Sequence, residues 1–232
     1  MADTVLITGA SRGLGLEFVR QYAKDGWRVH ACARDPKSSS ALQGLASAHR
    51  GEVRLHALDV ADWKAVAALA RGLKGEPLDV LLNNAGIYGS RTEPLGKVDA
   101  DSWIEVLRTN AIAPLKMAEA FVENVAGGRR KVIATVSSLM GSIADNSSGG
   151  YYPYRTSKAA VNMVMKSLAV DLKPRGIISV ALNPGWVRTD MGGATAPLGV
   201  ERSVRGMRKV LDGLTRKQSG KFFHYNGEEL PW

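Results

Sequence analysis

The sequence predicts an α/β fold in which one doubly wound, mostly parallel sheet of seven strands is flanked by helices. Short apolar segments alternate with amphipathic segments along the chain. The apolar segments lack the polar alternation of half-exposed strands, which is typical of strands buried on both faces of a parallel sheet. The chain shows neither an internal repeat nor a linker, so we expect a single domain over residues 1–232.

The expected strands are β-rich runs that are bounded by polar or glycine-containing segments. They lie at residues 4–8, 28–33, 53–58, 80–84, 131–136 and 177–182, with a possible seventh at 221–225. Amphipathic helical patterns lie between them, for example at residues 16–26, 62–75 and 101–125. This repeated strand–helix–strand order predicts right-handed crossovers between neighbouring parallel strands.

The composition is that of an ordinary globular protein, with 45% apolar and 23% charged residues among 232. No apolar run is long enough to span a membrane, and the N-terminus does not resemble a cleaved signal. The single cysteine, Cys32, excludes an intrachain disulfide, and these features together predict a cytoplasmic location. The net charge of +9 is scattered, so we expect no nucleic-acid partner, no membrane partner and no metal site.

The segment TGASRGLG follows the first expected strand and opens the first expected helix. Glycines at positions 9, 13 and 15 let the main chain turn tightly and approach a pyrophosphate, while the helix N-terminus offers free N–H groups. This strand–turn–helix context indicates a dinucleotide site. Its expected contacts are Gly9, Ser11, Arg12, Gly13, Leu14 and Gly15.

The end of the second expected strand decides between NAD and NADP. Asp35 lies about 20 residues beyond the glycine loop, where a carboxylate would accept hydrogen bonds from the ribose of NAD. Arg34 precedes it, however, and Arg12 lies inside the loop. Two guanidinium groups can bind a 2′-phosphate through charge-assisted hydrogen bonds. We therefore expect NADP, with NAD as the alternative cofactor. A purely structural alternative is that Arg34 and Asp35 form an ion pair at the surface.

The segment YYPYRTSK contains three tyrosines and two cationic residues. On a helix, Tyr154 shares a face with Lys158, and Tyr151 shares a face with Arg155. A tyrosine with its ordinary pKa of about 10 exchanges protons poorly at pH 7, so a neighbouring cation has to lower that pKa. Pro153 suits the first helical position, which places Tyr154 in the first turn and favours it over Tyr151.

A proline inside the long helical pattern at residues 101–125 predicts a local irregularity. Pro114 has no N–H group, so the carbonyl of Asn110 loses its helical partner. Asparagine is itself a poor residue for a helix interior. We expect a kink with a free carbonyl at Asn110.

Four segments together resemble the short-chain dehydrogenase/reductase family, whose members have a Rossmann-type fold. They are TGASRGLG, NNAG, YRTSK and NPGWVRT, in that order along the chain. The resemblance implies hydride transfer between a nicotinamide and a carbonyl or alcohol, with Tyr154 as general acid/base and Lys158 on the nicotinamide ribose. The further cofactor contacts that it implies are Arg34, Asp59, Val60, Asn84, Ala85, Gly86, Tyr154, Lys158, Pro184, Gly185, Val187 and Thr189. An alternative for Asp59 is the N-cap of the following helix.

The same resemblance implies two more catalytic residues. Ser138, in TVSSLMG after the fifth strand, would hydrogen-bond to the carbonyl oxygen, with Ser137 as the alternative. The carbonyl of Asn110 would hold a water that contacts Lys158.

Three longer segments, GSIADNSSGGYYPYRTSKAA, NPGWVRTDMGG and GKFFHYNGEELPW, resemble one branch of the family. That branch contains the C-factor signalling proteins and the sniffer-type carbonyl reductases. It implies an NADP-dependent carbonyl reductase with a small-molecule substrate, or alternatively a dinucleotide-binding signalling or regulatory protein with incidental turnover. The family commonly pairs through the helices that carry Asn110 and Tyr154, which implies a homodimer or homotetramer.

The segment after Thr189 is short, whereas the loop between Ser138 and Tyr154 is long. We expect the long loop to cover part of the substrate and the pocket to be fairly open. Its expected apolar walls are Ile143, Tyr151, Tyr152 and Trp186.

Overall fold

The computed structural model describes residues 2–90 and 95–232. Within them, seven strands form one sheet in the order β3-β2-β1-β4-β5-β6-β7. Every neighbouring pair is parallel. The predicted doubly wound α/β fold is confirmed, and the sheet is wholly rather than mostly parallel.

The strands are short and close to the predicted ranges. They are β1 (Thr4–Thr8), β2 (Arg28–Ala33), β3 (Val53–Ala57), β4 (Val80–Asn83), β5 (Val132–Val136), β6 (Ile178–Asn183) and β7 (Phe222–His224). β5 begins one residue later than predicted because Lys131 has φ 55°, a left-handed conformation that a strand does not accommodate. β6 extends to Asn183, which pairs with His224 on β7.

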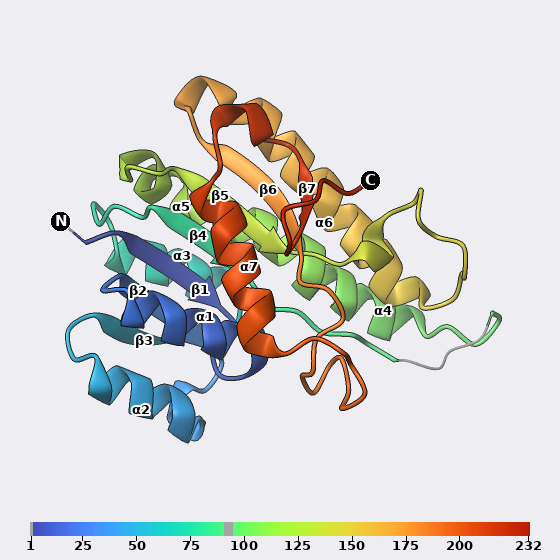
Figure 1. Cartoon of the computed structure of the whole chain (residues 1–232), viewed down its shortest axis with the longest axis horizontal. Coiled ribbons are helices and arrows are strands. Elements are labelled where there is room, and N and C mark those ends of the chain that lie inside the picture. Colours follow the sequence, from blue (N-terminus) through green and yellow to red (C-terminus); the bar gives the residue numbers. More distant parts are fainter. Residues whose placement is uncertain (1, 91–94) are drawn as a thin grey trace.

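Helices cover both faces of the sheet (Figure 1). The α-helices are α1 (Gly13–Lys24), α2 (Ser40–Ala48), α3 (Trp63–Gly72), α4 (Ala100–Leu107), α5 (Ala113–Gly127), α6 (Tyr152–Asp171) and α7 (Val200–Asp212). A π-helical turn at Arg108–Ile112 joins α4 to α5, and short 3₁₀ turns lie at Pro36–Ser38, Leu139–Gly141, Lys173–Arg175 and Arg216–Gln218. Within the described residues, no helix combines the length and apolar character that a membrane span requires.

Two apolar layers hold the sheet between the helices. Phe18 and Tyr22 of α1 pack with Leu42 of α2 and Met207 of α7 on one face. Residues of α3, α5 and α6, including Phe121, pack on the other. β1 lies between β2 and β4, so the chain order reverses beside it. In such sheets a ligand crevice forms outside the carboxyl ends of the strands at this reversal.

Candidate active site

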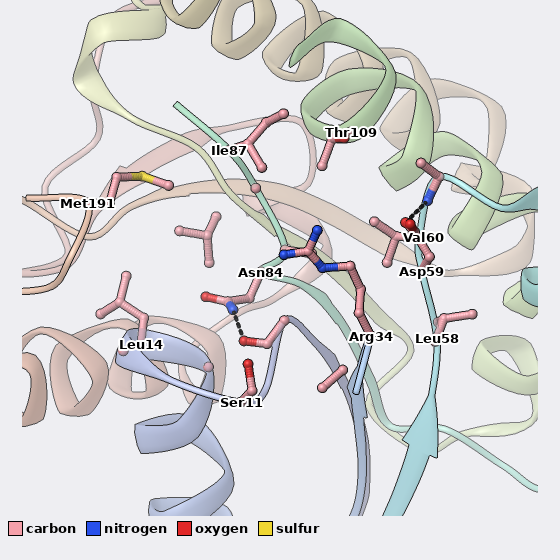
Figure 2. A pocket seen from close by; sticks show the side chains of 18 of the residues that line it. Ser11, Leu14, Arg34, Leu58, Asp59, Val60, Asn84, Ile87, Thr109 and Met191 are labelled. Atoms are coloured by element: carbon pink, nitrogen blue, oxygen red, sulfur yellow. Dashed lines mark hydrogen bonds between the residues drawn. The ribbon is translucent and has the colours of Figure 1, made fainter. Parts of the chain in front are cut away.

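A cavity of about 870 Å³ lies at the edge of the sheet where the strand order reverses beside β1. Its walls come from the glycine loop, the ends of β2 to β5, the start of α6 and the segment after β6. Figure 2 shows side chains from the glycine loop, from the segments after β2, β3 and β4 and from the segment after β6 converging on the cavity. One cavity therefore contains parts of all four sequence segments that predicted the site.

The glycine loop packs directly on the turn that follows β4. A Cβ atom at Gly9 would lie 2.8 Å from the Cα of Ala85, and one at Gly15 would lie 2.1 Å from the carbonyl oxygen of Gly9. Asn84 Nδ2 donates to the carbonyl oxygens of Thr8 and Gly9, at 2.9 and 3.2 Å. Only glycine fits these two positions, because the opposing atoms belong to the main chain.

The N-terminus of α1 suits an anion. Gly13 has φ 53°, and Arg12 at the N-cap makes no side-chain capping bond. The first N–H groups of α1 therefore lack a side-chain cap and face the glycine-loop end of the cavity. A dinucleotide pyrophosphate fits this cradle.

At the end of β2 the two neighbouring charged residues have different surroundings. Arg34 lines the cavity and extends between Asn84 and Asp59 in Figure 2. Asp35 instead caps a 3₁₀ turn, accepting from the N–H groups of Lys37 and Ser38 at 3.0 and 3.3 Å. One oxygen of the Asp35 carboxylate thus accepts from the main chain, and Asp35 does not line the cavity.

Arg12 forms an ion pair with Asp190 at 3.1 Å, and about three-quarters of each side chain is exposed. Such an exposed ion pair contributes little to stability, so the Arg12 guanidinium can leave Asp190 for a bound phosphate at a small cost in free energy. Arg12 also lines the cavity. Both arginines that the sequence assigned to a 2′-phosphate therefore border the same space.

Asp59 and Val60 line the cavity at the end of β3. The Asp59 carboxylate accepts from the N–H of Ala61 at 2.9 Å. The N-cap of α3 is Asp62, which accepts from the N–H groups of Lys64 and Ala65. The alternative of Asp59 as the helix N-cap is therefore wrong.

α6 begins at Tyr152, one residue earlier than expected, so Pro153 occupies its second rather than its first position. Tyr154 remains in the first turn, and Tyr154 and Lys158 both line the cavity. Lys158 Nζ lies 5.6 Å from the centroid of the Tyr154 ring and donates to the carbonyl oxygen of Val136 at 2.9 Å. Tyr151 precedes the helix with φ 51° and does not line this cavity.

Burial controls the titration of this pair. It raises the pKa of Tyr154 above its ordinary value, with a smaller increase from Tyr88 and a decrease from a hydrogen bond with Ser138. Burial also lowers the pKa of Lys158 to about 8. The pKa of the phenol is thus shifted in the direction opposite to the expected lowering by Lys158, because burial of the ring is the largest cause and Lys158 is not among the groups that shift it.

The two serines after β5 have different partners. Ser137 is buried and donates to Asn162 Oδ1 at 2.6 Å. The Ser138 hydroxyl accepts from the N–H of Met140 at 3.2 Å and hydrogen-bonds with Tyr154. Of the two hydroxyls, that of Ser138 lies next to the phenol.

Asn110 lies in the π-helical turn, so the helix is interrupted where Pro114 predicted an irregularity. Its side chain makes contacts that the sequence did not indicate. Oδ1 accepts from the N–H of Ile87 at 2.9 Å, and Nδ2 donates to the carbonyl of Ile87 at 2.8 Å and to Ser157 Oγ at 3.0 Å. Asn110 thus ties the segment after β4 to α6.

The four expected substrate walls do not line the cavity. Ile143, Trp186 and Tyr151 are 79%, 59% and 44% exposed, and Trp186 Nε1 donates to the carbonyl of Gly192 at 2.8 Å. Two of the expected cofactor contacts, Gly185 and Val187, also lie outside the lining of the cavity. Val187 is buried, in a β-bridge with Leu198, which turns its side chain into the protein.

The apolar surface near Tyr154 comes instead from residues that sequence reasoning missed. Ile87 and Met191 line the cavity, and the Tyr154 hydroxyl lies 4.0 Å from the sulfur of Met191. Tyr88 stacks on Tyr154. The one available signal was the position of Ile87 and Tyr88, directly after NNAG.

The chain is similar to a short-chain dehydrogenase family model over most of its length and to solved carbonyl reductases over all of it. The family model described as short chain dehydrogenase matches residues 3–197. C-signal from Myxococcus xanthus is 46% identical over 165 residues, which cover 71% of this chain and 99% of that protein. Carbonyl reductase Sniffer of D. melanogaster has a TM-score of 0.93 at 34% identity and covers 100% of both chains. The NADPH-bound carbonyl reductase from chicken fatty liver has a TM-score of 0.92 at 37% identity and covers 100% of this chain and 99% of its own.

These matches confirm the resemblance to the branch that contains the C-factor proteins and the sniffer-type reductases. The matched region contains the glycine loop, NNAG and the Tyr154–Lys158 pair. The chain belongs to the short-chain dehydrogenase family and is an oxidoreductase of that family.

Proposed function

We propose that this protein is an NADP(H)-dependent carbonyl reductase that acts on a small molecule and also catalyses the reverse oxidation of the alcohol. The observation that carries the proposal is the shared cavity, which joins the glycine loop and Arg34 to Tyr154 and Lys158. The similarity to two carbonyl reductases, one of them solved with NADPH, supports it.

The glycine loop and the N-terminus of α1 would hold the pyrophosphate, Arg34 and Arg12 the 2′-phosphate, and Lys158 the nicotinamide ribose. The bound cofactor supplies the hydride for reduction. The Tyr154 phenol is protonated at neutral pH and would donate its proton to the carbonyl oxygen, although the raised pKa of the buried phenol makes it a weaker acid than an exposed tyrosine. Ser138 hydrogen-bonds to that oxygen and orients it.

Lys158 has a second role in this mechanism. With a pKa of about 8 it is mostly protonated at neutral pH yet can release its proton. It is therefore suited to return a proton to Tyr154 after each reduction, with the carbonyl of Asn110 holding the connecting water.

The test is the oxidation of NADPH by purified protein with a panel of aldehydes, diketones and quinones, followed by the absorbance of the reduced nicotinamide. We expect turnover with at least one panel member and a higher kcat/KM for NADPH than for NADH. A clear preference for NADH would reject the NADP assignment.

The second candidate function is a dinucleotide-binding signalling or regulatory protein. The 46% identity to C-signal favours it. The same panel separates the two, since tight NADPH binding without oxidation by any compound would support the regulatory function over the reductase.

We also propose a cytoplasmic homodimer or homotetramer that pairs through α4, α5 and α6. Large apolar side chains are exposed along these helices and the turn that joins α4 to α5, namely Ile104 of α4, Ile112 of the π-helical turn, and Met163 and Val170 of α6, which are 61%, 44%, 65% and 64% exposed. Light scattering would give the oligomeric state. We expect Met163→Glu to shift it to monomer, and a wild-type monomer would contradict this proposal.

A further inference from the structure

Tyr88 covers one face of the Tyr154 ring. The two rings are nearly parallel, with an interplanar angle of 14° and centroids 4.2 Å apart. Tyr88 belongs to the segment after β4, whereas Tyr154 belongs to α6, so the contact is tertiary. Tyr154 is only 7% exposed. The stack is therefore part of the wall that keeps water from this ring.

The main chain on both sides of Tyr88 is fixed. On one side, the N–H and carbonyl groups of Ile87 both bond to the Asn110 side chain, at 2.9 and 2.8 Å. On the other side, Gly89 has φ 74°, and a Cβ atom there would lie 2.6 Å from Val106 Cγ2. A tyrosine between two such constraints has little freedom to move its ring by shifting the main chain.

The ring of Tyr88 is also held by side chains. Tyr151 packs edge-on against it, with centroids 6.1 Å apart and an interplanar angle of 87°. The Tyr88 hydroxyl lies 3.6 Å from the sulfur of Met140. Offset-stacked and edge-on contacts are the arrangements that aromatic rings favour. Two side chains besides Tyr154 thus hold the ring of Tyr88 in place.

The Tyr154 hydroxyl, by contrast, has flexible or weak partners. Its hydrogen bond with Ser138 involves one rotatable hydroxyl, and the sulfur of Met191 at 4.0 Å is a weak acceptor. These contacts can follow the phenol oxygen but cannot set the plane of the ring. The stacked ring of Tyr88 can set that plane, because a tilt of the Tyr154 ring would bring it into collision with Tyr88.

We propose that Tyr88 is a positioning residue, whose ring fixes the plane of Tyr154 and thereby aims its hydroxyl at the carbonyl oxygen of the substrate. This inference rests on the proposed function, in which Tyr154 donates the proton. Misplacing a reacting group by about 1 Å can lower the rate about a hundredfold, so a contact that fixes the Tyr154 ring can have a large effect on kcat. The hydroxyl of Tyr88 is not needed for this role.

Two substitutions separate the ring from the hydroxyl. Tyr88→Phe keeps the stack, and we expect kcat within about twofold of wild type. Tyr88→Leu removes it, and we expect kcat to fall about tenfold or more while the Kd of NADPH changes little. Phe18→Leu is the matched control, because Phe18 stacks on Tyr22 in the core, away from the cavity. It should lower the melting temperature but leave kcat unchanged.

A pH profile gives a readout that packing alone would not move. Removing the Tyr88 ring exposes Tyr154 to water, so the pKa of the phenol falls towards its ordinary value. The pH at which Tyr154 titrates should therefore be lower in Tyr88→Leu than in Tyr88→Phe, when it is followed by tyrosinate absorbance as the difference between each variant and the same variant carrying Tyr154→Phe. Equal kcat and equal profiles in the two variants would overturn the inference.

Tyr154→Phe distinguishes a failure of the proposed function from a failure of the positioning role of Tyr88. Normal turnover in that variant would reject the proposed function itself. Lost turnover in Tyr154→Phe, with wild-type kcat and pH profile in Tyr88→Leu, would reject only the positioning role of Tyr88.

Discussion

At the glycine-loop end of the cavity, main chain packs on main chain, whereas at the Tyr154 end side chains pack on side chains. Gly9 and Gly15 face the main-chain atoms of Ala85 and of the loop itself at distances that no Cβ atom tolerates. Tyr154 is surrounded by Tyr88, Ser138 and Met191. The first end has one possible residue at each tight position, while the second can exchange one side chain for another.

The two ends of the cavity therefore differ in how they respond to a substitution. Main-chain contacts cannot relax without moving a strand or a helix, so a substitution there affects the fold and cofactor binding together. Side-chain contacts relax locally, so a substitution there can alter the reaction while the fold and cofactor binding persist. Each of the following experiments tests this separation, from the largest effect to the smallest.

Tyr154→Phe should have the largest effect. The variant loses the proton donor but keeps the ring that stacks on Tyr88. We expect kcat to fall by about a hundredfold to ten-thousandfold, the range for a general acid. The Kd of NADPH, measured by fluorescence titration, should change less than about threefold. Weakened cofactor binding comparable to the loss of turnover would show that the two ends are not separate.

Gly15→Ala should be the largest change at the other end. Its Cβ atom would lie 2.1 Å from the carbonyl oxygen of Gly9, so the loop has to shift away from β4. We expect the free energy of unfolding to fall by about 1–3 kcal/mol and NADPH binding to weaken at least tenfold.

Gly44→Ala is its matched control. Gly44 lies inside α2 with no atom within 4 Å of the added Cβ. Stability should rise slightly, because alanine is the better helix former, and the Kd of NADPH should not change. Urea unfolding and cofactor titration measure both. Intact NADPH binding in Gly15→Ala would contradict the main-chain account of this end.

The same contrast explains what the sequence could predict. The glycine loop is a local pattern, since strand, turn and helix follow one another within residues 4–24. The i, i+4 pairing of Tyr154 with Lys158 is equally local. Their shared cavity follows from strand order, because the parallel strands bring both to one edge of the sheet. These features were predictable because each needs only local conformation plus topology.

The remaining features depend on tertiary contacts. The stack of Tyr88 on Tyr154 and the clamp of Asn110 on Ile87 join segments far apart in the chain, and no local pattern indicates them. Whether a polar group faces the cavity also depends on its neighbours. Asp35 had the spacing of a ribose ligand, but the following turn uses its carboxylate as a cap.

Arg34→Ala should have a moderate effect that is confined to the glycine-loop end. If Arg34 binds the 2′-phosphate, its loss removes a charge-assisted interaction worth about 1.5–3 kcal/mol. We expect kcat/KM for NADPH to fall about tenfold to a hundredfold. The value for NADH, which has no 2′-phosphate, should change little, and so should kcat with saturating NADPH. Equal losses with both cofactors would show that Arg34 shapes the cavity rather than selecting NADP.

The smallest effect should be a gradual one with pH, and it should appear only at the Tyr154 end. Burial lowers the pKa of Lys158 to about 8, so its ammonium loses its proton as the pH rises through that value. Tyr154, whose pKa is raised, stays protonated over the same range. The rate of carbonyl reduction should therefore decline severalfold between about pH 7 and pH 9, while the Kd of NADPH changes less.

Lys158→Arg identifies the group responsible for this decline. A guanidinium stays charged throughout the range, so a folded variant that still turns over should show a flatter profile. The folded pKa of Lys158 lies below its unfolded value, so the folded state holds fewer protons and the wild-type free energy of unfolding should rise between about pH 8 and pH 10. This rise should be smaller in Lys158→Arg. A wild-type decline in rate that persists unchanged in Lys158→Arg would assign the titration to another group and leave Lys158 as a ribose ligand alone.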